Sequence, residues 1–335
     1  MNERTPSPRG RSSRSTLGAY VAIARPDHWF KNGFMLLGVV LALSYRPGVL
    51  HGRAWWQLAV AVVATCLVAS SNYVLNEILD APHDRHHPLK RSRPVPSGLV
   101  SLPLAYAEWI LLAIAGGALA WSVNVPFFLS AAWLWVMGVL YNVPPIRTKE
   151  WAYVDVLSES INNPIRLLLG WFALVTSHVP PASLAISYWM AGAFLMAVKR
   201  YAEYRHIGNP EAAAAYRRSF RHYTEERLLL SAVFYAIVGA VFGGVFIVRY
   251  HLELVFSAPL IAGLFAYYLK LGMLADSPAQ RPERLYRHTP FMAYLTVCIV
   301  VFIALLALQL PVLYRVFEVE DSSMRALWQL GPIGK

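Results

Sequence analysis

The sequence predicts an all-α integral membrane protein, a bundle of about nine transmembrane helices. Hydrophobic residues make up 57% of the 335 residues and charged residues only 15%, whereas soluble domains carry about 25% charged residues. The apolar residues form long continuous runs, and lysine and arginine gather between alternate runs. Because the runs are continuous and do not alternate with polar residues, they favour helices over the strands of a membrane barrel.

Nine apolar runs have helical length, close to the roughly 20 residues that a helix needs to cross a bilayer. The first and the fourth are short. The predicted spans are 30–46, 55–79, 103–122, 125–141, 155–176, 183–201, 228–250, 253–275 and 290–314.

The distribution of lysine and arginine predicts the orientation of these spans. With the N-terminus inside, the cytoplasmic segments hold 22 of the 30 basic residues, which is the bias expected of cytoplasmic loops. These segments are 1–31, 80–102, 142–155, 199–227 and 276–288. The net charge of +11 therefore reflects topology, and we do not expect nucleic-acid binding because the basic residues lie in short loops between apolar runs.

An acidic stripe ends the second span. Asn76, Asp80 and Asp84 follow one another at four-residue intervals and so share a helix face; Asn72 extends the stripe and Glu77 lies beside it. Carboxylates at a helix C-terminus oppose the helix dipole, so helix stability does not explain them. Oxygen ligands of this kind suit Mg²⁺, which also takes phosphate oxygens. The alternative is a solvated helix end.

Cations follow the stripe at Lys90, Arg91 and Arg93. Beside a magnesium site such residues are typical phosphate ligands, although positive-inside topology alone would also place them there. Three histidines offer an alternative metal site that suits a hard ion less well: His83, His86 and His87.

A second polar segment ends the sixth span, where Lys199 and Glu203 share a helix face. They could form an ion pair, or they could offer a cation to phosphate and a carboxylate to a hydroxyl or metal. The basic residues that follow, Arg217 among them, could instead face anionic lipid headgroups.

Polar residues also enter the first and fifth spans, where an unpartnered polar group would be costly. We expect these residues to face a shared interior cavity at the cytoplasmic half of the bundle. They are Lys31, Asn32, Asp155, Glu159, Asn162, Asn163 and Arg166.

The stripe resembles NDxxDxxxD, the first aspartate-rich motif of the UbiA superfamily of intramembrane prenyltransferases. This resemblance covers residues 20–310 and implies nine helices around a central cavity. The segment from Arg25 to Asn32 is similar to the RPxxWxKN start of the decaprenyl-phosphate phosphoribosyltransferase branch, and Lys199-Arg200-Tyr201-Ala202-Glu203 is similar to its KRYAE segment. The resemblance to this branch implies transfer of a phosphoribosyl group from phosphoribosyl pyrophosphate to a polyprenyl phosphate, with Mg²⁺.

Two departures from the superfamily pattern matter. Glu77 stands where the motif has its first aspartate, which keeps a carboxylate that is one methylene longer. Members that use prenyl diphosphates carry a second DxxxD motif at the end of the sixth helix, and this chain has Lys199 to Glu203 there. That argues against two magnesium ions holding a prenyl diphosphate.

We therefore expect the phosphoribosyl transfer described above, with three groups of site residues. Asp80, Asp84, Lys199 and Glu203 are the expected catalytic residues. The expected metal ligands are Asn76, Glu77, Asp80 and Asp84. The expected substrate-binding residues are Arg25, Lys31, Asn32, Asn72, Asn76, Lys90, Arg91, Arg93, Asp155, Arg166, Arg200 and Tyr201.

Two alternatives remain open. The chain could be a prenyltransferase that moves a prenyl group from a prenyl diphosphate to an aromatic or lipid acceptor, or a non-catalytic lipid-binding or transport protein. We expect a disordered basic cytoplasmic tail at 1–24, a nine-helix membrane catalytic domain at 25–315 and a short tail at 316–335. The site is expected on the cytoplasmic side of the plasma (inner) membrane.

Overall fold

The computed structural model describes residues 16–85, 90–280, 285, 287–319 and 329. Within these residues the chain forms helices and no named strand. Seven segments are long and apolar enough to cross a membrane, and they match seven predicted spans. They are α3 (Arg53–Asp84), α4 (Leu102–Val123), α5 (Val125–Asn142), α8 (Ala182–Ile207), α10 (Glu225–Tyr250), η5 with α11 (Leu252–Ser257 and Ala258–Gly272) and α12 (Thr289–Ala307).

The other two predicted spans are each divided into two shorter helices. The first consists of η1 (Pro26–Phe34) and α2 (Met35–Tyr45), and the fifth of α6 (Val154–Ser160) and α7 (Asn162–Phe172). Pro164 explains the second division, because a proline has no N–H to donate to the carbonyl of Ser160. Beside this break, the side-chain amide of Asn162 donates to the carbonyl of Glu159 at 3.0 Å.

The segment expected to be a disordered tail requires a correction. Residues 16–24 form α1 (Thr16–Ala24), and residues 1–15 lie outside the described part. Ala19 and Ile23 of α1 are buried with Ala81 of α3 and Ala105 of α4. The alanine and isoleucine that form this small core are too few for a transmembrane run, so the apolar pattern alone did not reveal the helix.

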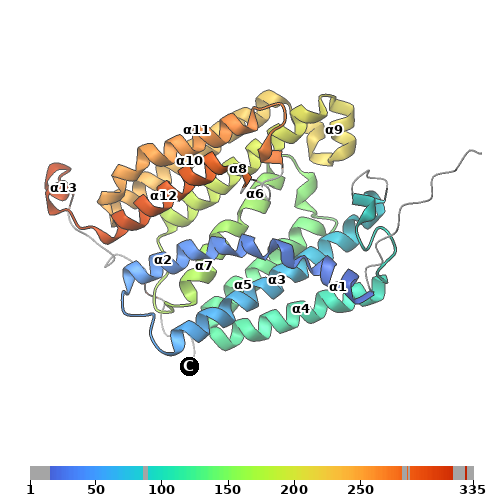
Figure 1. Cartoon of the computed structure of the whole chain (residues 1–335), viewed down its shortest axis with the longest axis horizontal. Helices are drawn as coiled ribbons and strands as arrows, with labels where there is room; N and C mark the ends of the chain where they lie inside the picture. Colours follow the sequence, from blue (N-terminus) through green and yellow to red (C-terminus); the bar gives the residue numbers. More distant parts are fainter. Residues whose placement is uncertain (1–15, 86–89, 281–284, 286, 320–328, 330–335) are drawn as a thin grey trace, which may run out of the picture.

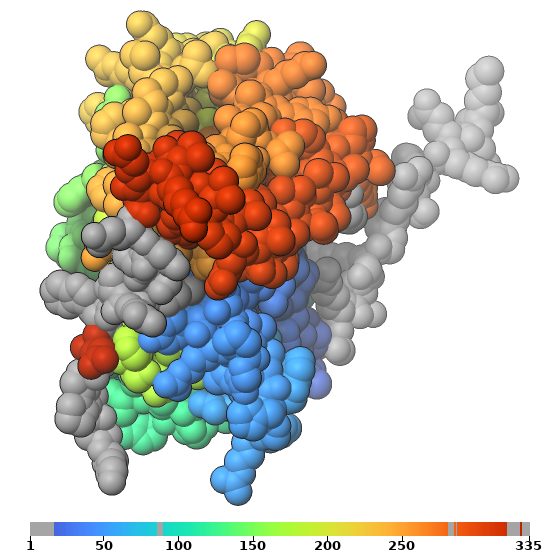
Figure 2. All heavy atoms as spheres, turned by 90° about the vertical axis from the view of Figure 1, so that its left-hand side faces the viewer, coloured from blue at the N-terminus to red at the C-terminus, as the bar shows by residue number. Residues whose placement is uncertain are grey.

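The helices form two layers (Figure 1). The N-terminal half, with α2 to α5 and α7, makes the lower layer, and α8, α10, α11 and α12 make the upper layer. One hydrophobic core lies mainly in the lower layer and also includes Leu184 of α8, Phe246 of α10 and Leu305 of α12, whereas a second core lies mainly in the upper layer. Figure 2 shows the end of the molecule where the last helices, in red, lie directly above the first helices, in blue.

Shorter helices lie at the two ends of the bundle. At the end shown on the right in Figure 1, α9 (Pro210–Tyr216) lies at the end of the upper layer. At the opposite end α13 (Pro311–Val316) follows α12. Short 3-10 turns connect the longer helices: η2 (Lys90–Ser92), η3 (Thr148–Glu150), η4 (Arg218–His222) and η6 (Pro278–Gln280).

Candidate functional site

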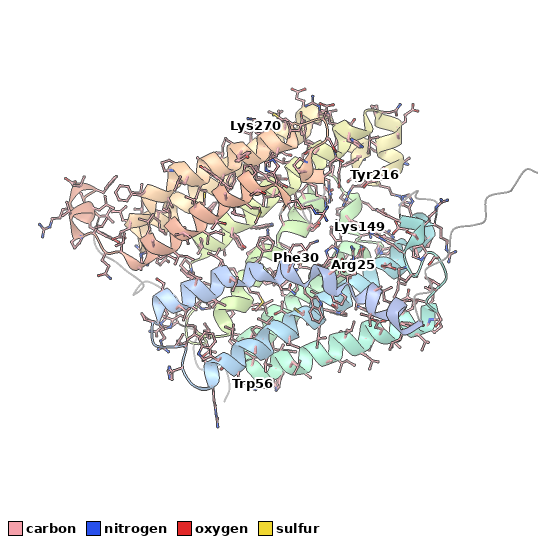
Figure 3. All side chains as sticks on the ribbon, viewed as in Figure 1. Arg25, Phe30, Trp56, Lys149, Tyr216 and Lys270 are labelled. Atoms are coloured by element: carbon pink, nitrogen blue, oxygen red, sulfur yellow. The ribbon has the colours of Figure 1, made fainter. Side chains whose placement is uncertain are left out.

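The charged residues predicted from the sequence gather where the last turns of α3, α5 and α8 meet α6 and the turns η2, η3 and η4. Lys149 of η3 and Tyr216 of α9 mark this region, between the two layers, in Figure 3. Four separate stretches of sequence supply its polar side chains.

Asp80 is the centre of the first cluster. Its Oδ1 accepts hydrogen bonds from Arg147 Nη2 at 3.0 Å and from Lys149 Nζ at 2.6 Å. Lys149 also donates to Asn142 Oδ1 at 2.8 Å, and the amide of Asn76 donates to that same oxygen. Two cations of the connection between α5 and α6 thus contact one carboxylate of α3.

Asp84 lies one turn further along α3 and is only 1% exposed. Its Oδ2 accepts from Arg93 Nη1 at 2.8 Å, and Lys90 Nζ lies 3.9 Å from its Oδ1. The Lys90 ammonium also lies 5.5 Å from the centre of the Tyr216 ring. Arg91, between these two cations, is exposed.

The remaining polar residues of α3 turn toward other helices. Asn72 donates to the carbonyl of Leu134 in α5 at 2.9 Å. Glu77 is buried, and its Oε1 accepts from the backbone N–H of Val95 at 3.2 Å. The structure therefore brings Asn76, Asp80 and Asp84 to one side of α3 and leaves Glu77 apart from them.

Arg200 of α8 is the centre of the second cluster and is 2% exposed. Its three guanidinium nitrogens each reach a different carboxylate: Asp155 at 3.3 Å, Glu203 at 3.1 Å and Glu159 at 2.7 Å. Lys199 Nζ lies 4.0 Å from Glu203. The predicted pair of Lys199 and Glu203 is therefore present, but Arg200 makes the shorter contact.

Asp155 ties α6 to the segment after α8. It is fully buried and accepts hydrogen bonds from Tyr223 at 2.8 Å and from Ser219 at 3.1 Å, and Arg217 Nε lies 3.4 Å away. Arg217 also donates to the Tyr141 hydroxyl at 2.9 Å. Since Tyr141 of α5 precedes Asn142, these contacts connect the second cluster to the first.

Other predicted residues lie at the edge of this site. Tyr201 is buried, accepts from Arg205 at 3.0 Å and belongs to a separate apolar cluster with Phe220 and Tyr223. Lys31 is close enough to Glu159 for their charges to interact. The Arg25 guanidinium lies 5.9 Å from the centre of the Tyr73 ring.

Asn32 and Arg166 form a buried pair deeper in the bundle. Arg166 donates to Asn32 Oδ1 at 3.0 Å and to the carbonyl of Asn162 at 3.2 Å. Asn32 in turn donates to Cys66 Sγ at 3.2 Å. The polar residues of the first and fifth spans thus meet, as the sequence predicted, in the interior.

Strained backbone surrounds the site. Among the described residues, four that are not glycine have positive φ, and three of them are Arg25 (52°), Arg147 (32°) and Tyr153 (66°). Such conformations cost roughly 1–3 kcal/mol each and cluster at functional sites. Arg147 itself contacts Asp80, so part of the strain is stored in a residue of the site.

Burial also affects the pKa of the two lysines in the connecting loops. It lowers the pKa of Lys149, an effect that Asp80 partly offsets. Burial lowers the pKa of Lys90 as well, and Asp84 partly offsets it. These ammonium groups are poorly hydrated and would therefore gain from a phosphate oxygen.

The oxygen atoms of the α3 stripe suit a magnesium ion that keeps some of its ligands from water or phosphate. No group of three or more His, Cys, Asp or Glu side chains that could hold a metal is present in the described part of the chain, and His86 and His87 lie outside it. Asp80, Asp84 and the Asn76 amide offer two carboxylates and one neutral oxygen. This set fits an ion that takes its remaining ligands from water or phosphate, and it does not form a closed cage.

Sequence reasoning missed several residues of the site. Arg147 and Lys149 were counted only in the basic charge of a loop, and Tyr141 and Asn142 were not predicted as site residues. Their signal was weak, because Arg147 and Lys149 lie 67 and 69 residues from Asp80. A polar end to the fourth span, next to a short basic loop, is the pattern that could have found them.

Comparisons with known proteins agree with this architecture. The model of the UbiA prenyltransferase family matches residues 34–295. A UbiA homolog from Archaeoglobus fulgidus bound to GPP and Mg²⁺ has the same fold, with a TM-score of 0.65 and 18% identity over 87% of this chain and 100% of that chain.

Several known proteins are similar in sequence. Decaprenyl-phosphate phosphoribosyltransferase of Mycolicibacterium smegmatis is 29% identical over 64% of this chain and 65% of its own length. Nodulation protein NoeC of Azorhizobium caulinodans is 30% identical over 65% of this chain and 69% of its own length. The chain thus spans about two thirds of these relatives. Together with the family match, these findings show that this integral membrane protein is a transferase of the UbiA prenyltransferase family.

Proposed function

We propose that this protein transfers a phosphoribosyl group from phosphoribosyl pyrophosphate to a polyprenyl phosphate at the membrane, with Mg²⁺. The observation that carries the proposal is the end of α8. The end of α8 carries Lys199, Arg200 and Glu203, whereas superfamily members that bind a prenyl diphosphate have a second aspartate pair at this place. Arg200 is already bound by three carboxylates. The similarity to a decaprenyl-phosphate phosphoribosyltransferase supports the same assignment.

The charges suit a donor that carries two separate phosphate groups. Arg147 and Lys149 lie on one side of Asp80, and Lys90 and Arg93 lie beside Asp84. Magnesium held by Asp80 and Asp84, with Asn76 in reach, would neutralise charge on the leaving pyrophosphate. Stabilising developing charge in this way is usually the largest catalytic effect.

The reaction needs no general base. The bond from the anomeric carbon to the pyrophosphate oxygen breaks, and its electron pair leaves with the pyrophosphate. An oxygen of the polyprenyl phosphate, already an anion, forms the new bond to that carbon. In this proposal Arg147 and Lys149 exchange Asp80 for the phosphate oxygens of the donor, and Glu203 accepts hydrogen bonds from ribose hydroxyls.

The test uses purified protein in lipid nanodiscs, labelled phosphoribosyl pyrophosphate and a polyprenyl phosphate. We expect a labelled lipid that disappears with EDTA and returns with Mg²⁺. Asp80→Asn should lower the rate at least about 100-fold, whereas Arg218→Ala, whose side chain is 70% exposed, should not. If no polyprenyl phosphate accepts the label, the proposal is wrong.

Prenyl transfer is the second candidate. The fold is shared with a homolog bound to GPP and Mg²⁺, and the same two aspartates would then hold magnesium for a prenyl diphosphate. The same preparation distinguishes the two reactions: with an aromatic or lipid acceptor present and no phosphoribosyl pyrophosphate, a prenyltransferase would release pyrophosphate from a prenyl diphosphate as it moves the prenyl group to that acceptor. A magnesium-independent lipid binder would do neither.

A further inference from the structure

Arg166 of α7 is a buried cation whose partners are uncharged. Its side chain is in the bundle interior, and the residue is 8% exposed. It donates to Asn32 Oδ1 at 3.0 Å and to the carbonyl of Asn162 at 3.2 Å. No carboxylate of the described residues is close enough to interact with its charge. The ionisable groups that do so are Tyr73, Tyr188 and Cys66.

The guanidinium of Arg200 shows the usual arrangement of a buried arginine in this protein. Its nitrogens reach three carboxylates, which balance its charge. An arginine keeps its proton inside a protein, and a buried charge without a partner is costly. Ionisable residues inside a membrane bundle commonly mark the site of a ligand. Arg166 therefore lacks an anion that a ligand can supply.

Asn162 joins Arg166 to the charged site. Its carbonyl accepts from Arg166, and its side-chain amide donates to the carbonyl of Glu159, the residue whose carboxylate binds Arg200. Asn162 follows Glu159 by three residues, about 5 Å along a helix axis. Asn162 Oδ1 is buried and has no donor in the described part of the chain. A polar ligand beside Arg166 would thus be continuous with the second cluster.

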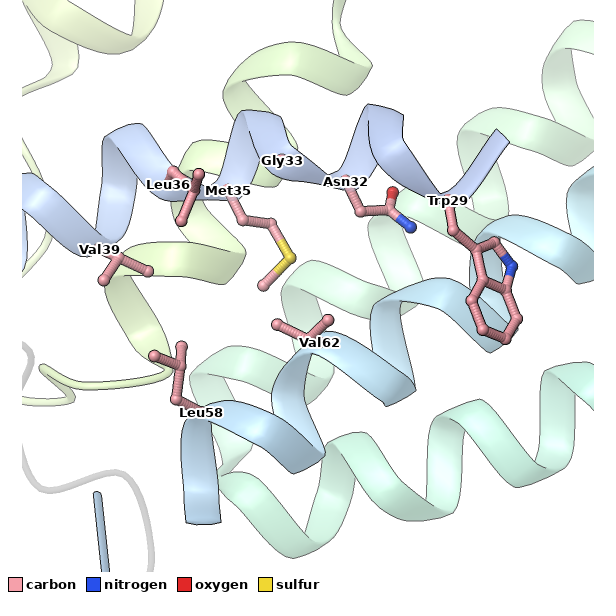
Figure 4. A pocket seen from close by; sticks show the side chains of 8 residues that line it. All are labelled: Trp29, Asn32, Gly33, Met35, Leu36, Val39, Leu58 and Val62. Carbon is pink, nitrogen blue, oxygen red and sulfur yellow. The ribbon is translucent and has the colours of Figure 1, made fainter. Parts of the chain in front are cut away.

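Asn32, the other partner of Arg166, has apolar surroundings. It lines a pocket between η1, α2 and α3 whose other side chains, apart from the indole of Trp29, are apolar (Figure 4). Figure 4 shows Met35 and Val62 on one side of Asn32 and Trp29 on the other. A soluble anion would have to give up its hydration here. The phosphate of a lipid is favoured, because the rest of the molecule is apolar.

We propose that Arg166 binds the phosphate of the polyprenyl phosphate acceptor, at a subsite separate from the magnesium site, and so makes the enzyme select an anionic lipid. The inference rests on the proposed function, which makes the acceptor a polyprenyl phosphate. The two phosphate groups of the donor have their own cations beside Asp80 and Asp84. The ribose lies between the two subsites, where Asn162 Oδ1 can accept from one of its hydroxyls.

Binding without reaction tests the subsite directly. In phosphatidylcholine nanodiscs with EDTA and no donor, decaprenyl phosphate should bind Asp80→Asn at least as tightly as the wild type. Arg166→Met should weaken this binding at least about tenfold, because charge-assisted hydrogen bonds are lost, and Arg166→Lys should weaken it less. Decaprenol, which has no phosphate, should bind these variants and the wild type equally. Binding that needs magnesium and Asp80 but not Arg166 would overturn the proposal.

Kinetics identify which phosphate Arg166 binds. Arg166→Met should raise KM for decaprenyl phosphate and leave KM for phosphoribosyl pyrophosphate close to that of the wild type. Arg249 is an exposed arginine at the end of α10, and Arg249→Met, the matched control, should change neither value. A larger rise in KM for the donor would assign Arg166 to the 5-phosphate of the ribose and overturn the proposal.

Thermal unfolding separates a ligand role from a structural one. Because Arg166→Met removes a buried charge that has no carboxylate partner, its melting temperature without lipid should equal or exceed that of the wild type. A lower melting temperature with unchanged binding of decaprenyl phosphate would make Arg166 a structural residue. If Arg166→Met does not fold, Arg166→Lys takes its place in each comparison.

The same measurements distinguish this proposal from the proposed function. Binding of decaprenyl phosphate that depends on Arg166, without any phosphoribosyl transfer, would support the subsite and reject the reaction. Phosphoribosyl transfer with lipid binding that is independent of Arg166 would do the reverse.

Discussion

At the scale of single residues, Arg200 holds the second cluster of the site together. Its side chain is held by carboxylates from α6 and from its own helix, with Glu159 nearest at 2.7 Å. The sequence placed Lys199 and Glu203 on one helix face, which is correct, but helix spacing cannot show which cation a carboxylate prefers. That choice depends on α6, which contacts α8 from 41 residues away.

Removing this guanidinium should destabilise the fold strongly. Arg200→Leu removes the buried cation that Asp155, Glu159 and Glu203 share, and breaking a buried ion pair typically costs about 3–5 kcal/mol. Arg218→Ala removes an exposed ion pair with Glu150 and should change stability by no more than about 0.5 kcal/mol. Thermal unfolding in detergent micelles measures both, and similar melting temperatures for the two variants would contradict the structural role of Arg200.

Tyr223 should make stability depend on pH in the alkaline range. Burial raises the pKa of its hydroxyl above 10, and the neighbouring Asp155 charge adds to the increase. Below pH 10 the folded and unfolded states both keep this proton. Above pH 10 the unfolded state loses it first, so this contribution to stability falls as pH rises.

The comparison is between the wild type and Tyr223→Phe. The variant lacks the hydrogen bond to Asp155 and should melt at a lower temperature at pH 8. Between pH 8 and pH 10.5 its melting temperature should fall by less than that of the wild type. Parallel curves would show that Tyr223 does not titrate in this way.

At the scale of helices, the sequence predicted the existence of the spans better than their continuity. Apolar length is enough to identify α3, α10 and α12, because it is the property that the bilayer requires. The division between α6 and α7 could have been predicted from Pro164, which follows two asparagines. The helix α1 could not, since its burial depends on α3 and α4.

The close contact of α2 with α7 predicts that Gly→Ala substitutions there lower the stability of the fold, the opposite of their usual effect in a helix. Gly→Ala inside a helix normally stabilises it by about 0.5–1 kcal/mol. At Gly38 and Gly170 an added Cβ would instead overlap a backbone carbonyl of the partner helix, so Gly38→Ala and Gly170→Ala should lower the melting temperature. Gly244→Ala, where an added Cβ would have no atom within 4 Å, should leave it unchanged or raise it. A stabilising effect at Gly38 or Gly170 would contradict the close packing of these helices.

At the scale of the whole molecule, the distribution of lysine and arginine along the sequence and the structure both indicate one polar end of the bundle. The segments 80–102, 142–155 and 199–227, which the lysine and arginine count grouped on one side, together supply the site. The sequence could predict this grouping because basic residues are retained on the cytoplasmic side. It could not predict which side chains pair there, since the partners come from different loops.

The orientation itself can be tested with introduced cysteines, because the chain has only Cys66 and Cys298, both buried. With these two replaced by serine, Glu211→Cys in α9 and Arg53→Cys at the start of α3 place single exposed thiols at opposite ends of the bundle. A membrane-impermeant maleimide should label Arg53→Cys in intact cells and Glu211→Cys only in inverted membrane vesicles. Permeabilised cells, in which both thiols must react, control for reactivity.

The result bears on the reaction as well as on topology. A cytoplasmic Glu211 would place Asp80 and Arg200 where a soluble, multiply charged donor is made. Labelling of Glu211→Cys from outside intact cells would put the basic loops on the outer face, against the charge bias. The donor would then have to cross the bilayer, and transfer from phosphoribosyl pyrophosphate would lose its main physical support.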